Sequence, residues 1–276
     1  MANNEIQFSK LSGAGNDFIM IDNRNGVLNG DIHEWVKKVC RKGMSVGADG
    51  VILIEPSDKA DFKMRYFNAD GSEAETCGNG ARCVARFAHL KGIANSSMKF
   101  ETHAGLYKAL VSSRGLVKVQ MSDPDSPRFH IPLELSMGKF EAHFINTGVP
   151  HVVVITESLD NLDIVHIGRE IRYHNEFAPA GTNVNFAQAI GPKRIRIRTY
   201  ERGVENETLA CGTGSIASSI ILFRLRKVMS PVTVVTQGGP ELTISFDSDE
   251  KKVYNVFLEG DARLVYEGSL SEEALA

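Results

Sequence analysis

The chain has 276 residues, of which 42% are hydrophobic and 24% charged, a composition typical of a globular protein long enough for two domains. A formal net charge of -3 at pH 7 gives no indication of binding to nucleic acid or to an anionic membrane. The N-terminal residues lack a signal-peptide pattern and no apolar run is long enough to span a bilayer, so we expect a cytoplasmic protein.

The first part of the chain combines several strand-like segments with two helical patterns. Apolar residues at helical spacing follow Asp31 and Cys77, and they predict helices that end near residues 42 and 90. Alternating apolar and polar residues between turn signals predict strands. The expected strands are 6–11, 18–21, 51–55, 61–67, 99–101, 107–112 and 117–121.

The segment Ser122–Pro127 is rich in proline and acidic residues, and it predicts a linker and a domain boundary. After it, helices are expected at 162–174 and from Cys211 to about residue 227. The alternation of basic and apolar residues in 193–198 predicts the solvated face of a strand. The expected strands are 139–146, 152–156, 182–189, 193–200, 232–236, 242–246, 253–259 and 262–266.

Many strands, few helices and no regular βαβ alternation predict an α+β fold with largely antiparallel sheets. A weak repeat suggests two related halves, because a strand leads through a Gly-containing loop and a Glu-Thr pair to a cysteine helix at Cys77 and again at Cys211. We therefore expect two pseudo-symmetric domains, each a mostly antiparallel sheet around a central helix, with the active-site cleft between them. The domains are residues 1–121, joined by the tail 263–276, and residues 122–262.

The four cysteines have no Cys-x-x-Cys spacing, so we expect reduced thiols rather than a disulfide framework. Cys40 and Cys83 fit the usual role of a small buried hydrophobic residue. Cys77 and Cys211 differ, because each begins a Cys-Gly-x-Gly sequence at a predicted helix N-terminus. No histidine lies at ligand spacing from either, and we expect no metal site.

This doubled motif points to acid–base chemistry on an amino acid. A helix N-terminus stabilises a thiolate, and glycines let backbone N–H groups approach an anion closely. Two such sites could hold one carboxylate and place a sulfur on each face of the adjacent carbon. One thiolate would remove the α-proton and the opposite thiol would return one, without metal, pyridoxal phosphate or nucleotide. His151 fits a polar cleft residue and a structural residue equally well.

These motifs resemble the diaminopimelate epimerase family over nearly the whole chain. The family interconverts LL- and meso-diaminopimelate, a precursor of lysine and peptidoglycan, without a cofactor, and it has two related domains. The resemblance implies that Cys77 deprotonates the LL isomer and Cys211 the meso isomer. The matching segments are Gly13–Phe18, Phe67–Ser72, Cys77–Cys83, Tyr200–Gly203 and Ala210–Gly214.

The resemblance also implies how the substrate is bound. The backbone amides of Gly78, Asn79, Gly212 and Thr213 would hold the reacting carboxylate. A distal carboxylate needs a guanidinium, and a distal ammonium needs oxygen acceptors. The implied residues for binding the rest of the substrate are Asn16, Asn68, Asn183, Glu201 and Arg202.

Two positions depart from the family pattern. Val149 stands where the family commonly has an asparagine before Pro-His, and Gly50 stands where it has a glutamine. Both bear on how strictly the distal end is recognised. A related racemase acting on proline, hydroxyproline or glutamate remains an alternative, as does a non-catalytic amino-acid-binding protein. The sequence is also compatible with a homodimer.

Overall fold

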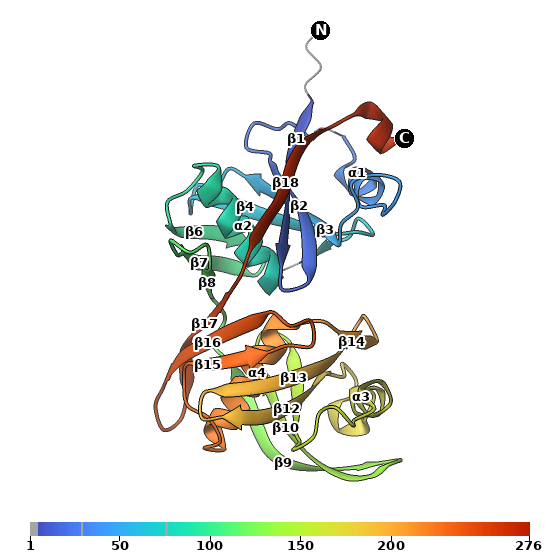
Figure 1. The fold of residues 1–276 in the computed structure, drawn as a ribbon, viewed down its shortest axis with the longest axis vertical. Helices are drawn as coiled ribbons and strands as arrows, with labels where there is room; N and C mark the ends of the chain where they lie inside the picture. The colour runs from blue at the N-terminus through green and yellow to red at the C-terminus, as the bar shows by residue number, and fades with distance from the viewer. Residues whose placement is uncertain (1–4, 29, 75–76) are drawn as a thin grey trace. The chain divides into compact units, whose positions relative to one another are not determined.

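The computed structural model describes residues 5–28, 30–74 and 77–276, and the chain folds as two compact units (Figure 1). Unit 1 comprises Met1–Val119 and Gly260–Ala276, and unit 2 comprises Gln120–Glu259. The boundaries predicted from the sequence lie a few residues further along the chain. Unit 1 is therefore discontinuous in sequence, whereas unit 2 is a single segment.

The strands of unit 1 pair in the order β18–β1–β2–β3–β4–β6–β7–β8, and the short β5 pairs with β4. Neighbours are antiparallel except for β2 with β3 and β4 with β6. The strands are β1 (Ile6–Gly13), β2 (Asn16–Asp22), β3 (Gly50–Glu55), β4 (Phe62–Asn68), β5 (Glu73–Ala74), β6 (Ser97–Thr102), β7 (Gly105–Val111), β8 (Val117–Gln120) and β18 (Arg263–Leu270).

The strands of unit 2 pair in the order β9–β10–β11–β12–β13–β15–β16–β17, with the short β14 on β13. The parallel pairs are β11 with β12 and β13 with β15. The strands are β9 (Asp125–Leu135), β10 (Gly138–Asn146), β11 (Pro150–Ile155), β12 (Asn183–Gly191), β13 (Arg194–Glu201), β14 (Asn206–Thr208), β15 (Val232–Val235), β16 (Glu241–Ser248) and β17 (Val253–Gly260).

The two units therefore share one strand order, with parallel pairs at equivalent places. The β9 position of unit 2 is filled in unit 1 by β18, which comes from the other end of the chain and runs antiparallel along β1 (Figure 1). This match accounts for the discontinuity of unit 1, since its outer strand follows unit 2 in sequence. The fold is the α+β class with two related domains, as the sequence predicted.

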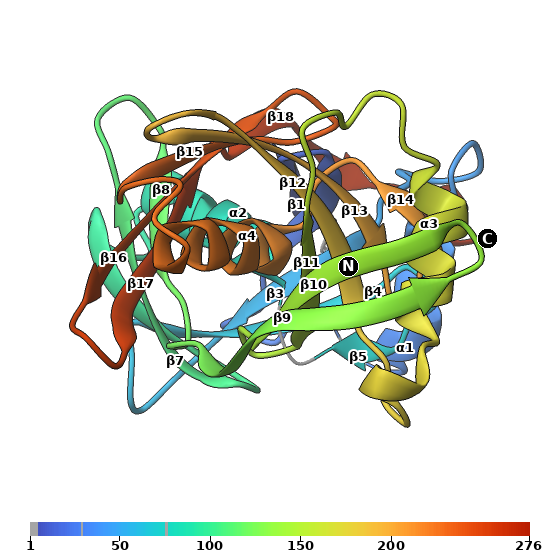
Figure 2. The ribbon, with the colours of Figure 1, turned by 90° about the horizontal axis from the view of Figure 1, so that it is seen from below.

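The α-helices of the described residues occupy equivalent crossovers between parallel strands in the two units. The helices α2 (Gly78–Leu90) and α4 (Gly212–Arg224) contact the strands of their own units on several sides, and Figure 2 shows strands around α4. Almost all of α4 is buried, which explains why its sequence is apolar with small residues on every face. The shorter helices α1 (Ile32–Val39) and α3 (Ile164–Arg172) have one buried face each. The described residues also form 3-10 turns at η1 (Asn175–Phe177) and η2 (Glu272–Leu275).

Several predicted segments differ from the observed ones. The expected linker Ser122–Pro127 holds only in part, because β9 begins at Asp125 and continues as a long strand that turn residues hid in the sequence. The two-residue and three-residue strands β5 and β14 were not predicted, since they are too short to show alternation. The helices begin or end up to a few residues from the expected positions.

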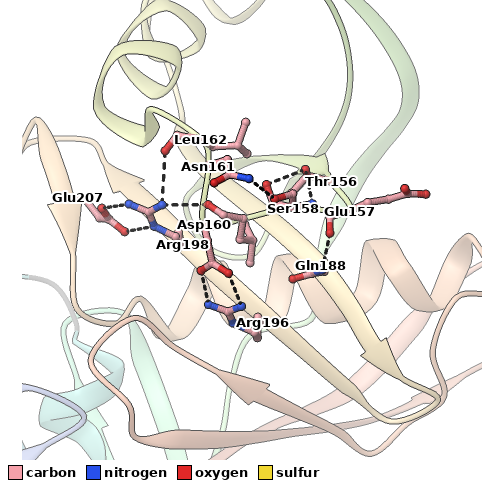
Figure 3. A network of polar contacts seen from close by, with 11 residues as sticks. Thr156, Glu157, Ser158, Asp160, Asn161, Leu162, Gln188, Arg196, Arg198 and Glu207 are labelled. Carbon is pink, nitrogen blue, oxygen red and sulfur yellow. Dashed lines mark hydrogen bonds and ion pairs between the residues drawn. The ribbon is translucent and has the colours of Figure 1, made fainter.

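The short strands are held by matched arginine–glutamate pairs. Arg65 on β4 donates two hydrogen bonds to Glu73 on β5 at 2.9 Å, and Arg198 on β13 donates two to Glu207 on β14 at 2.7 Å. Such paired contacts are stronger and more directional than a single bond. Figure 3 shows Arg198 also bonded to the loop after β11.

The arginines of β13 correct one prediction. Arg196 is paired with Asp160 at 2.8 Å near the surface (Figure 3), as expected for a solvated strand face. The Arg198 side chain is only 16% exposed, because Glu207 and the carbonyls of Leu159 and Leu162 surround its guanidinium. Arg198 is therefore an arginine because it forms an ion pair with Glu207, and not because this position of the strand faces solvent.

Candidate active site

Cys77 is the N-cap residue of α2. Its backbone is extended, and its sulfur accepts the backbone N–H of Gly80 at 3.4 Å. A cysteine here replaces the hydroxyl or carboxylate oxygen that usually caps a helix, so the helix N-terminus supports negative charge on the sulfur. Gly80 packs closely on the strand beneath, since a Cβ there would lie 2.9 Å from the end of the Ile52 side chain, which would have to move to accommodate it.

Polar side chains around the start of α2 form one connected network. Asn79 donates to Asn16 Oδ1 at 2.8 Å, and Asn16 donates to Asp49 Oδ2 at 3.0 Å. The guanidinium of Arg82 donates to Asn79 Oδ1 at 2.9 Å and to the carbonyl of Gly78 at 3.3 Å. Arg82 is wholly buried, and burial lowers its pKa. The structure thus brings together Asn16, Gly78 and Asn79, three of the residues that the sequence singled out.

Asn68 lies at the end of β4, directly opposite Gly50 in the strand register. Its side chain donates to the hydroxyl of Ser72 at 3.0 Å, which holds the turn after β4. A Cβ at Gly50 would lie 2.7 Å from the Tyr66 ring and would overlap the Phe67 carbonyl. A glutamine therefore does not fit at residue 50 without a shift of β4. We call Asn16, Asn68, Cys77, Gly78 and Asn79 the Cys77 half-site.

Cys211 repeats this arrangement in unit 2. It is the N-cap of α4, its backbone is extended, and its sulfur accepts the backbone N–H of Gly214 at 3.4 Å. The hydroxyl of Thr213 lies 3.5 Å from the same sulfur. The hydroxyl of Thr147, on the loop before β11, donates to the Thr213 carbonyl at 3.3 Å. Both predicted cysteine helices therefore have the same capping geometry.

A buried polar group lies beneath this second helix start. A Cβ at Gly214 would overlap Oδ1 of Asn185, so the glycine lets the helix rest on this carboxamide. Asn185 also contacts His151 and Thr199, and all three side chains are 2% exposed or less. Burial lowers the pKa of His151 to about 3, and the charge of Arg202 acts in the same direction. At neutral pH His151 is therefore a neutral, buried imidazole, and either role that the sequence left open for it must be filled by that form.

Three predicted substrate-binding residues lie close together in unit 2. Asn183 Oδ1 accepts the backbone N–H of Arg202 at 2.9 Å. Asn183 begins β12 and Glu201 ends β13, each next to the register pair Val184 and Tyr200. The Arg202 guanidinium donates to the Ala180 carbonyl at 3.2 Å. Burial raises the pKa of Glu201. The Cys211 half-site is defined by His151, Asn183, Glu201, Arg202, Cys211, Gly212 and Thr213.

Cys40, Cys83 and Val149 are the remaining positions that the sequence singled out. Cys40 and Cys83 are buried, and burial raises the pKa of each thiol to about 12. Val149 lies half-buried on the turn before β11, and its carbonyl accepts the N–H of Thr147 at 3.1 Å. Within the described residues, no group of three or more His, Cys, Asp or Glu side chains has the arrangement of a metal site. The Glu-Thr pair at 75 and 76 lies outside the described residues.

Sequence reasoning did not identify the polar residues that support the half-sites. One signal was available for Asn185, because a second asparagine two residues after Asn183 in an apolar strand predicts a buried polar group on the same face. Asp49, Arg82 and Thr147 carried no comparable signal. Their contacts depend on segments that are distant in the sequence.

No helix among the described residues is both long enough and apolar enough to cross a membrane.

The fold matches solved structures of low sequence identity. A phenazine biosynthesis protein of the PhzF family from Bacillus anthracis matches with a TM-score of 0.75 and 16% identity, over 97% of this chain and 99% of that one. A hydroxyproline epimerase from Agrobacterium vitis matches with a TM-score of 0.72 and 16% identity, over 99% and 94%. These likenesses establish the fold alone.

Sequence comparison establishes the family. The model of the diaminopimelate epimerase family matches residues 8–126 and 143–265, which include both cysteine motifs. The diaminopimelate epimerase of Aquifex aeolicus is 47% identical over 281 aligned positions, covering 98% of this chain and 99% of that protein. The chain therefore belongs to the diaminopimelate epimerase family.

Proposed function

We propose that this protein epimerises LL-diaminopimelate to meso-diaminopimelate, with Cys77 and Cys211 as the two acid–base groups. The observation that carries this proposal is the repeated cap. In each unit a cysteine begins a thirteen-residue helix and its sulfur accepts a glycine N–H at 3.4 Å, in a chain that belongs to this enzyme family. Neither unit alone supplies more than one such thiol.

In the proposed mechanism, one thiolate removes the α-proton and the other thiol donates a proton to the opposite face of the same carbon. The electron pair of the broken C–H bond moves into the adjacent carboxylate. Backbone amides of Gly78, Asn79, Gly212 and Thr213 would bind that carboxylate and stabilise the added charge. After one turnover the two sulfurs have exchanged protonation states, so the reverse reaction uses the same groups.

The distal end of the substrate is proposed to bind Asn16, Asn68, Asn183, Glu201 and Arg202. A guanidinium such as that of Arg202 matches a carboxylate with two parallel hydrogen bonds. Burial penalises the charged form of Glu201, and a substrate ammonium would offset that penalty by pairing with it. The proposal includes a cytoplasmic location and requires no cofactor. A homodimer is compatible with it.

The direct test is incubation with LL-diaminopimelate in deuterated water, followed by mass and stereochemical analysis. We expect one deuterium at the inverted α-carbon and meso product, and activity that survives treatment with a metal chelator. Parallel reactions with glutamate and proline test the racemase alternative. Turnover of either in place of diaminopimelate would reject the proposed substrate.

The two-thiol mechanism has its own test. Cys77→Ala and Cys211→Ala should each abolish epimerisation, whereas Cys83→Ala should keep the chemistry, because Cys83 is a buried thiol that is neutral at neutral pH. Full epimerisation by either of the first two variants would contradict the mechanism.

A further inference from the structure

The two units have equivalent strand positions beneath their cysteine helices, but the residues there differ in kind. The registers align β2, β3 and β4 of unit 1 with β11, β12 and β13 of unit 2. In each unit the middle strand supplies the residue against the third helix position, Ile52 under Gly80 and Asn185 under Gly214. The equivalent sets are Phe18, Ile52 and Tyr66 in unit 1 and His151, Asn185 and Thr199 in unit 2.

A buried polar set where the other unit has a largely apolar one requires an explanation, because unpaired polar groups in a protein interior are costly. The carboxamide of Asn185 is fully used. Its Nδ2 group donates to the Val152 carbonyl at 3.0 Å and lies 3.1 Å from Nδ1 of His151, while its Oδ1 accepts the hydroxyl of Thr199 at 3.0 Å. Both hydrogens of the Asn185 amide nitrogen and its oxygen therefore have a partner within unit 2.

These contacts determine the orientation of the carboxamide. A backbone carbonyl only accepts hydrogen bonds, so the atom facing Val152 is the nitrogen of Asn185. The second hydrogen of that nitrogen is directed at Nδ1 of His151, which must accept it. In a neutral imidazole one nitrogen accepts and the other carries the proton. The proton of His151 therefore lies on Nε2.

The Nε2 atom of His151 is buried and has no hydrogen-bond partner among the described residues. His151 is 0% exposed, and the charged group acting on it is Arg202, a residue of the Cys211 half-site. A buried donor without a partner destabilises the folded protein, because it has lost its hydrogen bonds to water and gained none in return. The arrangement is explained if a ligand supplies the missing acceptor.

We propose that Asn185 is a positioning residue that fixes the Nε2–H tautomer of His151, so that His151 presents a hydrogen-bond donor, and not a base, to an acceptor oxygen of the substrate. This inference rests on the proposed function for the identity of the substrate. The acceptor chemistry is that of a carboxylate oxygen, which gains charge when the α-proton leaves. The same carboxamide supports Gly214, whose N–H binds the Cys211 sulfur, so one side chain orients two donors of the half-site.

The tautomer can be observed directly in the full-length protein labelled with ¹⁵N-histidine. Two-bond ¹H–¹⁵N correlation spectra distinguish the two neutral tautomers and the imidazolium, and His151→Gln identifies the signal among the eight histidines. We expect the Nε2–H pattern near neutral pH in the wild type. Asn185→Asp offers His151 only acceptor oxygens, and we expect the Nδ1–H or imidazolium pattern there.

Measurements of kcat and KM with diaminopimelate then distinguish a positioning role of Asn185 from a role in packing alone. Loss of one oriented donor costs roughly 100-fold in kcat, and we expect a fall of that order for Asn185→Asp with little change in KM. Thr199→Val is the matched control, because it alters a bond to the same carboxamide but leaves the contact with His151 intact. It should retain the Nε2–H tautomer and lose far less activity.

His151→Gln distinguishes a donor from a base, since glutamine can donate from a similar position but cannot take up a proton. We expect it to retain much of the activity that His151→Ala loses. A wild-type Nδ1–H or imidazolium pattern, an unchanged tautomer in Asn185→Asp, or equal inactivity of the glutamine and alanine variants would overturn the inference. Failure of the wild type to epimerise diaminopimelate would instead reject the proposed function, and the tautomer spectrum would still decide the role of Asn185.

Discussion

Two buried side chains, Arg82 and Asn185, support the starts of the cysteine helices through contacts with segments that are distant in the sequence. The cysteines, their glycines and the substrate-binding candidates lie in local motifs, so the sequence alone could single them out. Arg82 and Asn185 were missed because their importance depends on contacts with distant segments. Arg82 donates to the carbonyl of Asp261, and Asn185 contacts both neighbouring strands. A residue's neighbours in a sheet cannot be read from a motif until the register is known.

The first prediction concerns Arg82. Arg82→Met removes a buried cation and leaves Asn79 Oδ1 and the Gly78 carbonyl without this donor. An unpaired buried acceptor costs about 1–3 kcal/mol, and we expect the free energy of unfolding to fall by about that amount or more. Urea denaturation measures it. Arg86→Met, a half-buried arginine on the same helix, is the control and should cost less.

The second prediction concerns the pH dependence of stability. In the unfolded chain His151 takes up a proton near its ordinary pKa of 6.5, whereas burial delays uptake in the folded protein to about pH 3. The resulting stability is fully present above pH 6.5 and is lost as the pH falls. Relative to His151→Gln, the wild type should lose about 2 kcal/mol between pH 6.5 and about pH 5. Parallel curves for the two proteins would contradict the burial of a neutral imidazole.

At the scale of elements, the central helices were predicted well because their cysteine caps mark where they start. Their positions are set by glycines that touch the strands beneath. Gly80 rests on the flexible end of Ile52, whereas Gly214 rests on the carboxamide of Asn185, which three hydrogen bonds hold in place. The partners β5 and β14 escaped prediction, since a strand of two or three residues has too few side chains to show a period.

This difference between the helices gives a third prediction. Gly214→Ala should force α4 away from Asn185 and destabilise the protein by about 1–3 kcal/mol, with a large loss of activity. Gly80→Ala should cost less, because the Ile52 side chain can adopt another rotamer. Thermal unfolding and epimerase assays on both variants test the comparison. An equal or larger effect of Gly80→Ala would show that the polar support is no more rigid than the apolar one.

At the scale of the whole molecule, the sequence repeat predicted two related domains but not their shared strand order. The shared order depends on β18, which lies beside β1 in the place that β9 has beside β10. The pairing joins residues at opposite ends of the chain, and no local pattern in the sequence encodes such a contact.

A fourth prediction tests the role of β18. Deleting residues 263–276 removes the antiparallel partner of β1 and should reduce hydrogen-exchange protection in β1 and β2. Protection in α4 should persist, because unit 2 has its own core. Deleting only 271–276 removes η2 and keeps β18, so it should have a smaller effect. Loss of protection in α4 after the longer deletion would indicate that the units do not unfold separately.

The place of β18 also has a consequence for synthesis on the ribosome. Domains generally fold as units while the chain emerges, with N-terminal domains first. Here all of residues 120–259 leave the exit tunnel before β18 can reach β1. Unit 2 can therefore complete its sheet while unit 1, although begun earlier, still lacks its outer strand. The Cys77 half therefore cannot be complete until the whole of the Cys211 half has been synthesised, although its cysteine comes first in the sequence.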